Sequence, residues 1–205
     1  MRKQTKRIIA VTTLLIFTLT LSGCNFLDNE LGKMKEELKG RDVIIQTYDE
    51  SSQIIDRIEG KSVSINPDTK FSIQDSGGST VEKSSVLEIT IGGKSILHVG
   101  SSLVLQEKGL ENIFEEYAKT TDVTNTDRSI PFLNQMLNSF KNMTTGKDKV
   151  ILIRSQSGQP LATYMGKNVS YFSTDIDKST GLIVDGKYLF IYRADYTIYH
   201  TELLQ

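Results

Sequence analysis

Residues 181–193 read GLIVDGKYLFIYR, two apolar runs joined by a short polar turn. Asp185 and Gly186 are residue types that adopt the positive φ angles of a two-residue hairpin turn, and β-branched and aromatic residues flank them. The register that follows from this turn is Val184 with Lys187, Ile183 with Tyr188, and Leu182 with Leu189. The stretch therefore predicts an antiparallel hairpin, and it indicates that the chain around it is rich in strands.

A second hairpin is predicted around Gly92 and Gly93, which separate apolar runs at 85–91 and 94–99. This turn pairs Leu87 with His98, so His98 shares a face with the apolar residues. A hydrogen-bonded core histidine is the common outcome at such a position, and we expect it here in preference to a ligand-binding role.

Further strands are predicted wherever short alternating or apolar runs are bounded by turn residues. They are 43–48, 53–58, 62–65, 71–73, 101–106, 149–154, 161–165, 169–172 and 196–203. Polar segments at 49–52 and 59–61 would make the first three strands an antiparallel meander.

Apolar residues at helical spacing predict three helices. The first covers residues 26–39 and ends at Gly40, the second covers 109–119, and the third begins at a Ser129 cap and ends near 144–146. The apolar side of the first could dock on the domain, lie at a bilayer surface or meet a partner helix, and docking is favoured. The patterns together predict an α+β fold that is β-rich, with a mostly antiparallel sheet or a partly closed barrel and about three helices.

The N-terminus has the layout of an export signal. Four basic residues precede an apolar run at 8–21, which is too short to span a bilayer comfortably. Leu21-Ser22-Gly23-Cys24 follows, and it resembles the lipobox of bacterial lipoproteins. That resemblance implies a diacylglycerol thioether on Cys24, carrying acyl chains such as palmitate, and cleavage between Gly23 and Cys24. An ordinary secretion signal that ends near a cysteine, or a buried core cysteine, are the alternatives.

These features divide the chain into a signal peptide at 1–23, a lipidated helical tether at 24–40 and a β-rich domain at 41–205. Four of the 24 basic residues and none of the 25 acidic residues lie in the signal, so the mature 182 residues carry a formal charge of −5. This balance does not suit nucleic acid, and it would hold the body off an anionic membrane surface. Cys24 is the only cysteine, so the exported domain would stand without disulfides.

Motifs for catalysis or metal binding are not found in the sequence. Asp175 and Asp177 lie two residues apart, but no further ligand pattern completes a cation site around them. Neither His98 nor His200 stands in a recognisable triad context, and no Gly-x-Ser-x-Gly elbow occurs. We therefore predict no catalytic residue, no metal and no cofactor beyond the diacylglycerol on Cys24, although a triad assembled in space stays open.

One aromatic stripe gives the only predicted ligand surface. If the last strands stayed straight, aromatic and apolar residues from 188 to 198 would fall on one face. Such a stripe is usually core packing, and the alternative is a ligand wall. The candidate wall residues are Tyr188, Tyr192 and Tyr196.

Several phrases of the sequence resemble small lipoproteins of Gram-positive bacteria that carry a domain of unknown function. The phrases are Leu21-Ser22-Gly23-Cys24-Asn25-Phe26-Leu27-Asp28, Gly40-Arg41, Thr47-Tyr48-Asp49, Gly60-Lys61-Ser62-Val63-Ser64-Ile65 and Tyr188-Leu189-Phe190-Ile191-Tyr192-Arg193. The resemblance implies a location and no activity. A looser likeness in strand pairs is to the phospholipid scramblase and LURP type, and it implies a barrel of strands around a central helix.

These observations lead to one expected function and one alternative. We expect a lipoprotein anchored to the cell membrane on its extracytoplasmic face, acting as a non-catalytic binding or accessory module of the envelope. Its partners would be the membrane, through the lipid, and an unidentified envelope protein or ligand, but not nucleic acid. The alternative is an envelope hydrolase that acts on cell-wall or lipid substrates, which requires a histidine beside a serine or carboxylate.

Overall fold

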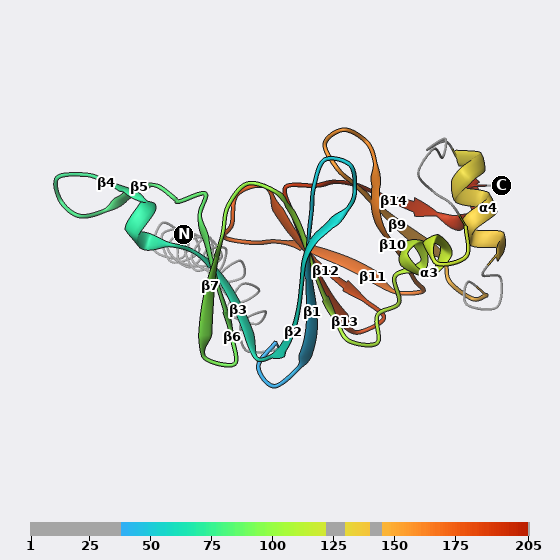
Figure 1. The fold of residues 1–205 in the computed structure, drawn as a ribbon, viewed down its shortest axis with the longest axis horizontal. Helices are drawn as coiled ribbons and strands as arrows, with labels where there is room; N and C mark the ends of the chain where they lie inside the picture. Colours follow the sequence, from blue (N-terminus) through green and yellow to red (C-terminus); the bar gives the residue numbers. More distant parts are fainter. Residues whose placement is uncertain (1–37, 122–129, 140–144, 205) are drawn as a thin grey trace, which may run out of the picture. The chain divides into compact units, whose positions relative to one another are not determined.

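A computed structural model of the chain describes residues 38–121, 130–139 and 145–204 (Figure 1). The strands are β1 (Asp42–Tyr48), β2 (Ile54–Lys61), β3 (Val63–Pro67), β4 (Ile73–Gln74), β5 (Thr80–Glu82), β6 (Leu87–Ile91), β7 (Lys94–His98), β8 (Ser102–Glu107), β9 (Lys149–Arg154), β10 (Pro160–Gly166), β11 (Val169–Ser173), β12 (Ser179–Val184), β13 (Lys187–Tyr192) and β14 (Asp195–His200). The helices are α3 (Ile113–Ala118), α4 (Ile130–Ser139), η1 (Thr69–Phe71) and η2 (Thr201–Leu204).

The largest sheet has six antiparallel strands in the order β11-β12-β13-β8-β1-β2. Its β12–β13 hairpin has the predicted register, with Val184 opposite Lys187. Asp185 and Gly186 have φ angles of +48° and +82°, as a type I′ turn requires. The Asp185 carboxylate also accepts hydrogen bonds from the backbone N–H groups of Lys167 and Asn168, at 2.9 and 2.8 Å. The turn that was clearest in the sequence therefore also holds the β10–β11 connection in place.

A second sheet, β10-β9-β14, packs against the first and is covered by helices on its other face. Strand β9 shows that the two faces of this sheet pack against different neighbours. Ile151 and Ile153 belong to the core cluster formed with the six-stranded sheet, whereas Val150 and Leu152 belong to the cluster formed with α3 and α4. Figure 1 shows these helices beside β9, β10 and β14. The described core is therefore layered as sheet, sheet and helices.

The Gly92–Gly93 hairpin is also confirmed, and it belongs to a smaller sheet of order β3-β6-β7. His98 lies opposite Leu87 as predicted and is half-buried. Its Nε2 is 3.0 Å from the Ser101 carbonyl oxygen, and its ring meets the Tyr192 ring edge-on at 5.9 Å. His98 is thus a packed, hydrogen-bonded histidine of the strand pair. A two-stranded sheet, β4-β5, completes the set.

The predicted turn at 59–61 is wrong. Strand β2 runs through Gly60 to Lys61, and the chain bends only at Ser62, whose φ is +56°, before continuing as β3. Gly60 is required for packing rather than for a turn. A Cβ on this residue would lie 2.2 Å from Cγ2 of Ile91, so only glycine admits the Ile91 side chain there.

The predicted fold class needs two corrections. The described residues contain two α-helices rather than three, and the segment 26–37 of the first predicted helix lies outside them. No closed barrel forms, because the strands of the described ranges divide into four antiparallel sheets and β11 and β2 are left as edges of the largest. The barrel likeness fails for the same reason, since α4 packs on the outer face of a sheet. None of the described helices is long and apolar enough to cross a membrane.

Gly181 provides a test of the packing at the edge of the largest sheet. It lies opposite Phe172, and an added Cβ would fall 2.2 Å from a ring carbon of Phe172. We expect Gly181→Ala to lower the free energy of unfolding by about 1–3 kcal/mol, because the ring must move. In a Phe172→Ala background the same change is expected to cost less than about 0.5 kcal/mol. Urea unfolding of the four proteins measures this coupling, and equal costs in both backgrounds would contradict it.

Candidate functional site

A cleft opens between the β1–β2 turn, α3 and the start of β10. Its volume is about 710 Å³. The lining consists of hydroxyl, amide and apolar side chains with a single carboxylate, from Tyr48, Ser51, Ser52, Gln53, Ile54, Asn112, Phe114, Glu115, Ala118, Thr121, Gln159, Pro160 and Leu161. A second hollow of about 470 Å³ shares Asn112 and Glu115 with it. We call the two hollows together the Glu115 cleft.

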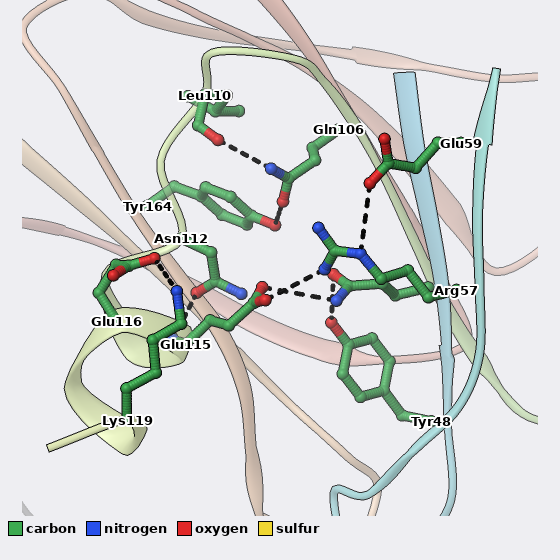
Figure 2. Close-up of polar contacts among 11 residues, drawn as sticks. Tyr48, Arg57, Glu59, Gln106, Leu110, Asn112, Glu115, Glu116, Lys119 and Tyr164 are labelled. Atoms are coloured by element: carbon green, nitrogen blue, oxygen red, sulfur yellow. Dashed lines mark hydrogen bonds and ion pairs between the residues drawn. The ribbon is translucent and has the colours of Figure 1, made fainter. Parts of the chain in front are cut away.

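An ion pair between a helix and an edge strand marks the centre of the Glu115 cleft (Figure 2). Nη1 of Arg57, on β2, lies 3.0 Å from Oε1 of Glu115 in the first turn of α3. The two side chains are 39% and 32% exposed, so a ligand in the cleft can reach both. Arg57 also contacts Glu59 at 3.5 Å, and Glu59 lies 2.7 Å from Lys108. The hydrogen bond and charge of Lys108, with Arg57 beside it, lower the pKa of Glu59.

Two tyrosine–glutamine pairs lie beneath this ion pair. The hydroxyl of Tyr48 donates to Oε1 of Gln46 at 3.0 Å, and Nε2 of Gln46 lies 3.5 Å from Oε2 of Glu115. The hydroxyl of Tyr164 donates to Oε1 of Gln106 at 2.5 Å, and Gln106 donates to the Leu110 carbonyl at 2.8 Å. All four side chains of the pairs are buried. Each glutamine amide thus has its buried oxygen satisfied, as a low-polarity interior requires.

Burial keeps both tyrosines protonated. It raises the pKa of Tyr48 and of Tyr164, and the negative charge of Glu115 raises both further. A phenol with a raised pKa is a hydrogen-bond donor at neutral pH and not a base. The layer beneath the cleft therefore positions Glu115 and does not exchange protons with a ligand.

Asn112 fixes the helix that carries Glu115. Its Oδ1 accepts from the backbone N–H of Glu115 at 3.4 Å and from that of Thr163, on β10, at 3.0 Å. This cap starts α3 at Ile113, four residues later than the sequence predicted. The pattern Asn-x-x-Glu at residues 112–115 is the sequence signal that could have located Glu115 at a helix start.

The predicted aromatic wall is divided between two sheets. Tyr188 and Tyr192 are buried on β13, whereas Tyr196 lies on β14 in the neighbouring sheet. The Arg41 guanidinium lies over the Tyr188 ring at 5.4 Å, Tyr192 donates to the Ser85 carbonyl at 3.1 Å, and Tyr196 contacts Thr180. The chain turns between them at Arg193, whose φ is +51°, so the straight strand assumed from the sequence does not exist.

The other candidate residues named from the sequence do not form a site in the described part of the chain, or lie outside it. Gly23 and Cys24 lie outside the described residues. Asp175 lies 3.8 Å from Lys83, and within the described ranges no three His, Cys, Asp or Glu side chains gather as metal ligands would. His200 is exposed on β14. Arg57, Gln46, Gln106 and Glu115 are not among the residues predicted from the sequence to have a function.

The described architecture defines a β-rich domain in which two helices cover one sheet and one of them borders a polar cleft. The sequence of residues 6–204 matches the family described as Domain of unknown function (DUF5052), and the chain belongs to that family. Neither a curated protein nor a solved structure matches it.

Alkaline unfolding tests the buried phenols. A phenol whose folded-state pKa is raised above its ordinary value of 10.0 stabilises the fold fully below pH 10, and that contribution is lost as the pH rises towards the folded pKa. The free energy of unfolding should therefore fall above pH 10, by up to about 1.4 kcal/mol per pH unit for each such group. Tyr164→Phe should flatten this fall, and at neutral pH it should cost about 1–2 kcal/mol because Gln106 loses a buried donor.

Tyr171→Phe is the matched control, because Tyr171 is 73% exposed on edge strand β11. It should leave both the neutral stability and the alkaline slope unchanged. Urea unfolding at a series of pH values measures the slopes, and the same slope in Tyr164→Phe as in the wild type would contradict the assignment.

Proposed function

We propose that this chain is a lipid-anchored, extracytoplasmic binding module of the cell envelope, with the Glu115 cleft as its ligand site. The support for the anchor is the basic and apolar N-terminal run followed by Leu21-Ser22-Gly23-Cys24. Two acyl chains on Cys24 would tether the protein stably. The tether predicted from the sequence covers residues 24–40.

The observation that carries the binding proposal is the half-exposed Arg57–Glu115 pair held between two hollows by a buried polar layer. Such preorganised polar groups in a concave, partly apolar cleft are the usual composition of a ligand site. Because almost all polar groups of the buried network have hydrogen-bond partners, the network holds Glu115 in one position. Ligand binding therefore does not have to order the Glu115 side chain.

The lining also indicates the class of ligand. Glu115 is neutralised by Arg57, and the remaining polar groups of the larger hollow are uncharged hydroxyls and amides. Ser52 lies in this lining with a left-handed backbone, and its buried Oγ has no hydrogen-bond partner in the described part of the chain. A neutral ligand rich in hydroxyl and amide groups, such as the glycan of a cell wall, would satisfy these groups.

The described geometry favours binding over hydrolysis. In the described ranges no hydrogen bond joins His98 or His200 to a serine hydroxyl or a carboxylate, and the Nε2 of His98 faces the Ser101 carbonyl. Glu115 is the one carboxylate of the larger hollow and is held in an ion pair with Arg57. The larger hollow therefore does not assemble a pair of carboxylates for acid–base work, and Glu111 and Glu116 join Glu115 only in the second hollow.

Replacing the cysteine tests the anchor. In the native host the wild-type protein should remain in the membrane fraction and incorporate radiolabelled palmitate. Cys24→Ala should incorporate none and should keep the uncleaved N-terminus, because the modification precedes cleavage in the scheme that the lipobox implies. Fractionation, labelling and the mass of the N-terminal peptide give three readouts, and palmitate incorporation by Cys24→Ala would contradict the lipobox.

Glu115→Gln tests the cleft, with Glu202→Gln as its control. Glu202 carries the same charge, is exposed in η2 and lines neither hollow of the cleft. With soluble N-acetylglucosamine oligomers as the neutral probe, we expect Glu115→Gln to raise the Kd about tenfold or more, since a hydrogen bond to a charged acceptor is weakened. Glu202→Gln should leave the Kd unchanged.

Isothermal titration calorimetry on the full chain in detergent measures both constants, and thermal unfolding checks that the variants fold. The Arg57–Glu115 pair is partly exposed, so its loss should cost less than about 1 kcal/mol. If both variants bind the oligomers as the wild type does, or if the wild type binds none, the proposed ligand site is wrong, whatever the outcome for Cys24.

A further inference from the structure

A separate pocket of about 330 Å³ lies at the open end of the β12–β13 hairpin, away from the β12–β13 turn. Four chain segments line it, contributing Phe71 and Ile73, residues 82–85 and Leu87, residues 176–178, and Tyr192 with Arg193. It shares no residue with either hollow of the Glu115 cleft. All of its lining residues belong to the described ranges.

Two basic residues face each other across this end of the hairpin. The backbone N–H of Arg193 donates to the Lys178 carbonyl at 2.9 Å. Lys178 and Arg193 both have left-handed φ angles, of +59° and +51°. Long side chains are disfavoured in this conformation, where glycine or asparagine is easily accommodated. Two cations thus stand in the pocket wall at positions where local backbone preference alone would select other residues.

The guanidinium of Arg193 is the unusual group. Its Nε is buried and has no hydrogen-bond partner, and no hydrogen bond or ion pair of this side chain is found in the described part of the chain. The other described arginines differ. Arg41 and Arg57 pair with Glu107 and Glu115, and Arg154 bonds to Thr197 and Tyr199. A buried donor without a partner is costly. Because Arg193 also lines the pocket, its guanidinium is the group left to pair with a ligand there.

The charges around the pocket indicate an anion with one negative charge. Lys83, Lys178 and Arg193 line the pocket together with Glu82 and Asp177, and Lys83 already pairs with Asp175. Lys178 and Arg193 are therefore the lining cations that remain for a ligand. Both lining carboxylates are exposed, so water screens them, whereas part of the Arg193 fork is buried. A guanidinium binds phosphate or carboxylate oxygens through parallel N–H donors. A dianion would be repelled by the two carboxylates more strongly than a monoanion.

The rim of the pocket is apolar and exposed. Phe71 and Ile73 line it and are 59% and 57% exposed, and Val81, which precedes the lining residue Glu82, is 68% exposed. Exposed large apolar side chains grouped beside a charged pocket mark a place where a ligand with both characters can bind. The apolar rim favours a phosphodiester that carries hydrophobic substituents over a small carboxylate.

We propose that this pocket binds a phosphodiester monoanion, with Arg193 donating to its oxygens, Lys178 adding charge, and Phe71 and Ile73 contacting its apolar substituents. The chemistry is that of a phosphatidylglycerol headgroup or of a soluble phosphate ester. The site is distinct from the Glu115 cleft and does not depend on the ligand proposed there.

Arg193→Asn tests this assignment without disturbing the fold, because asparagine tolerates the left-handed backbone at this position. Lys94→Asn is the matched control, since it removes one positive charge from an exposed end of β7. The probe is glycerophosphoglycerol, followed by ³¹P NMR during titration with the full chain in phosphorus-free detergent. We expect a saturable shift or broadening whose Kd rises about tenfold in Arg193→Asn and is unchanged in Lys94→Asn.

Three competitors identify the chemistry of the ligand and its source. Phosphatidylglycerol is added to the micelles, and inorganic phosphate is added to the solution. If phosphatidylglycerol displaces the probe more strongly than inorganic phosphate does, the ligand is a lipid headgroup. If inorganic phosphate is the stronger competitor, the ligand is a free phosphate ester. Acetate that competes as well as either overturns the phosphodiester assignment. Equal binding by Arg193→Asn and wild type, or no binding of the probe by a folded wild type, overturns the site, and circular dichroism melting of each variant establishes that it is folded.

Discussion

Strand β9 is covered on both faces, and the rest of the described fold depends on that double burial. Ile151 and Ile153 pack towards the six-stranded sheet, and Val150 and Leu152 pack towards the helices. A strand with both faces buried must be apolar without interruption, and the run VILI at residues 150–153, the buried part of β9, meets this requirement. Because β10 and β14 pair with β9, the same layer sets the position of every strand that borders α3.

The Glu115 cleft follows from this layering. Tyr164 lies on β10 and reaches Gln106 on β8, so one buried hydrogen bond links the two sheets. Asn112 then links the start of α3 to β10 through Thr163. Glu115 therefore has its place set by the sheet stacking and by a helix cap, and it meets Arg57 from the edge strand of the other sheet. A half-exposed ion pair would be loose on its own, but here both partners project from elements that the core holds fixed.

Local sequence patterns predicted the two hairpins, whereas contacts between distant residues determined the features that were predicted wrongly or missed. Both hairpins were predicted with their registers, because Asp185-Gly186 and Gly92-Gly93 specify the turn and the alternation specifies the faces. The turn at Gly60 was wrong, since only Ile91, thirty-one residues later, explains why glycine is needed there. The three-helix or barrel fold was wrong because strand order and closure depend on pairings between distant segments. Glu115 and Arg57 are 58 residues apart, and neither has a local signature of the ion pair.

Net charge and local charge lead to different expectations for the same chain. The formal charge of −5 on residues 24–205 predicts that the body is held off an anionic surface, because that estimate averages over all of its side chains. At the open end of β12–β13, two left-handed residues bring Lys178 and Arg193 into one pocket beside exposed apolar side chains. At distances shorter than the Debye length of about 8 Å, a bound group is affected mainly by the charges nearest to it and not by the net charge of the domain. A short tether at the proposed anchor would keep the domain near the bilayer, where an attraction confined to one pocket could orient an otherwise repelled body.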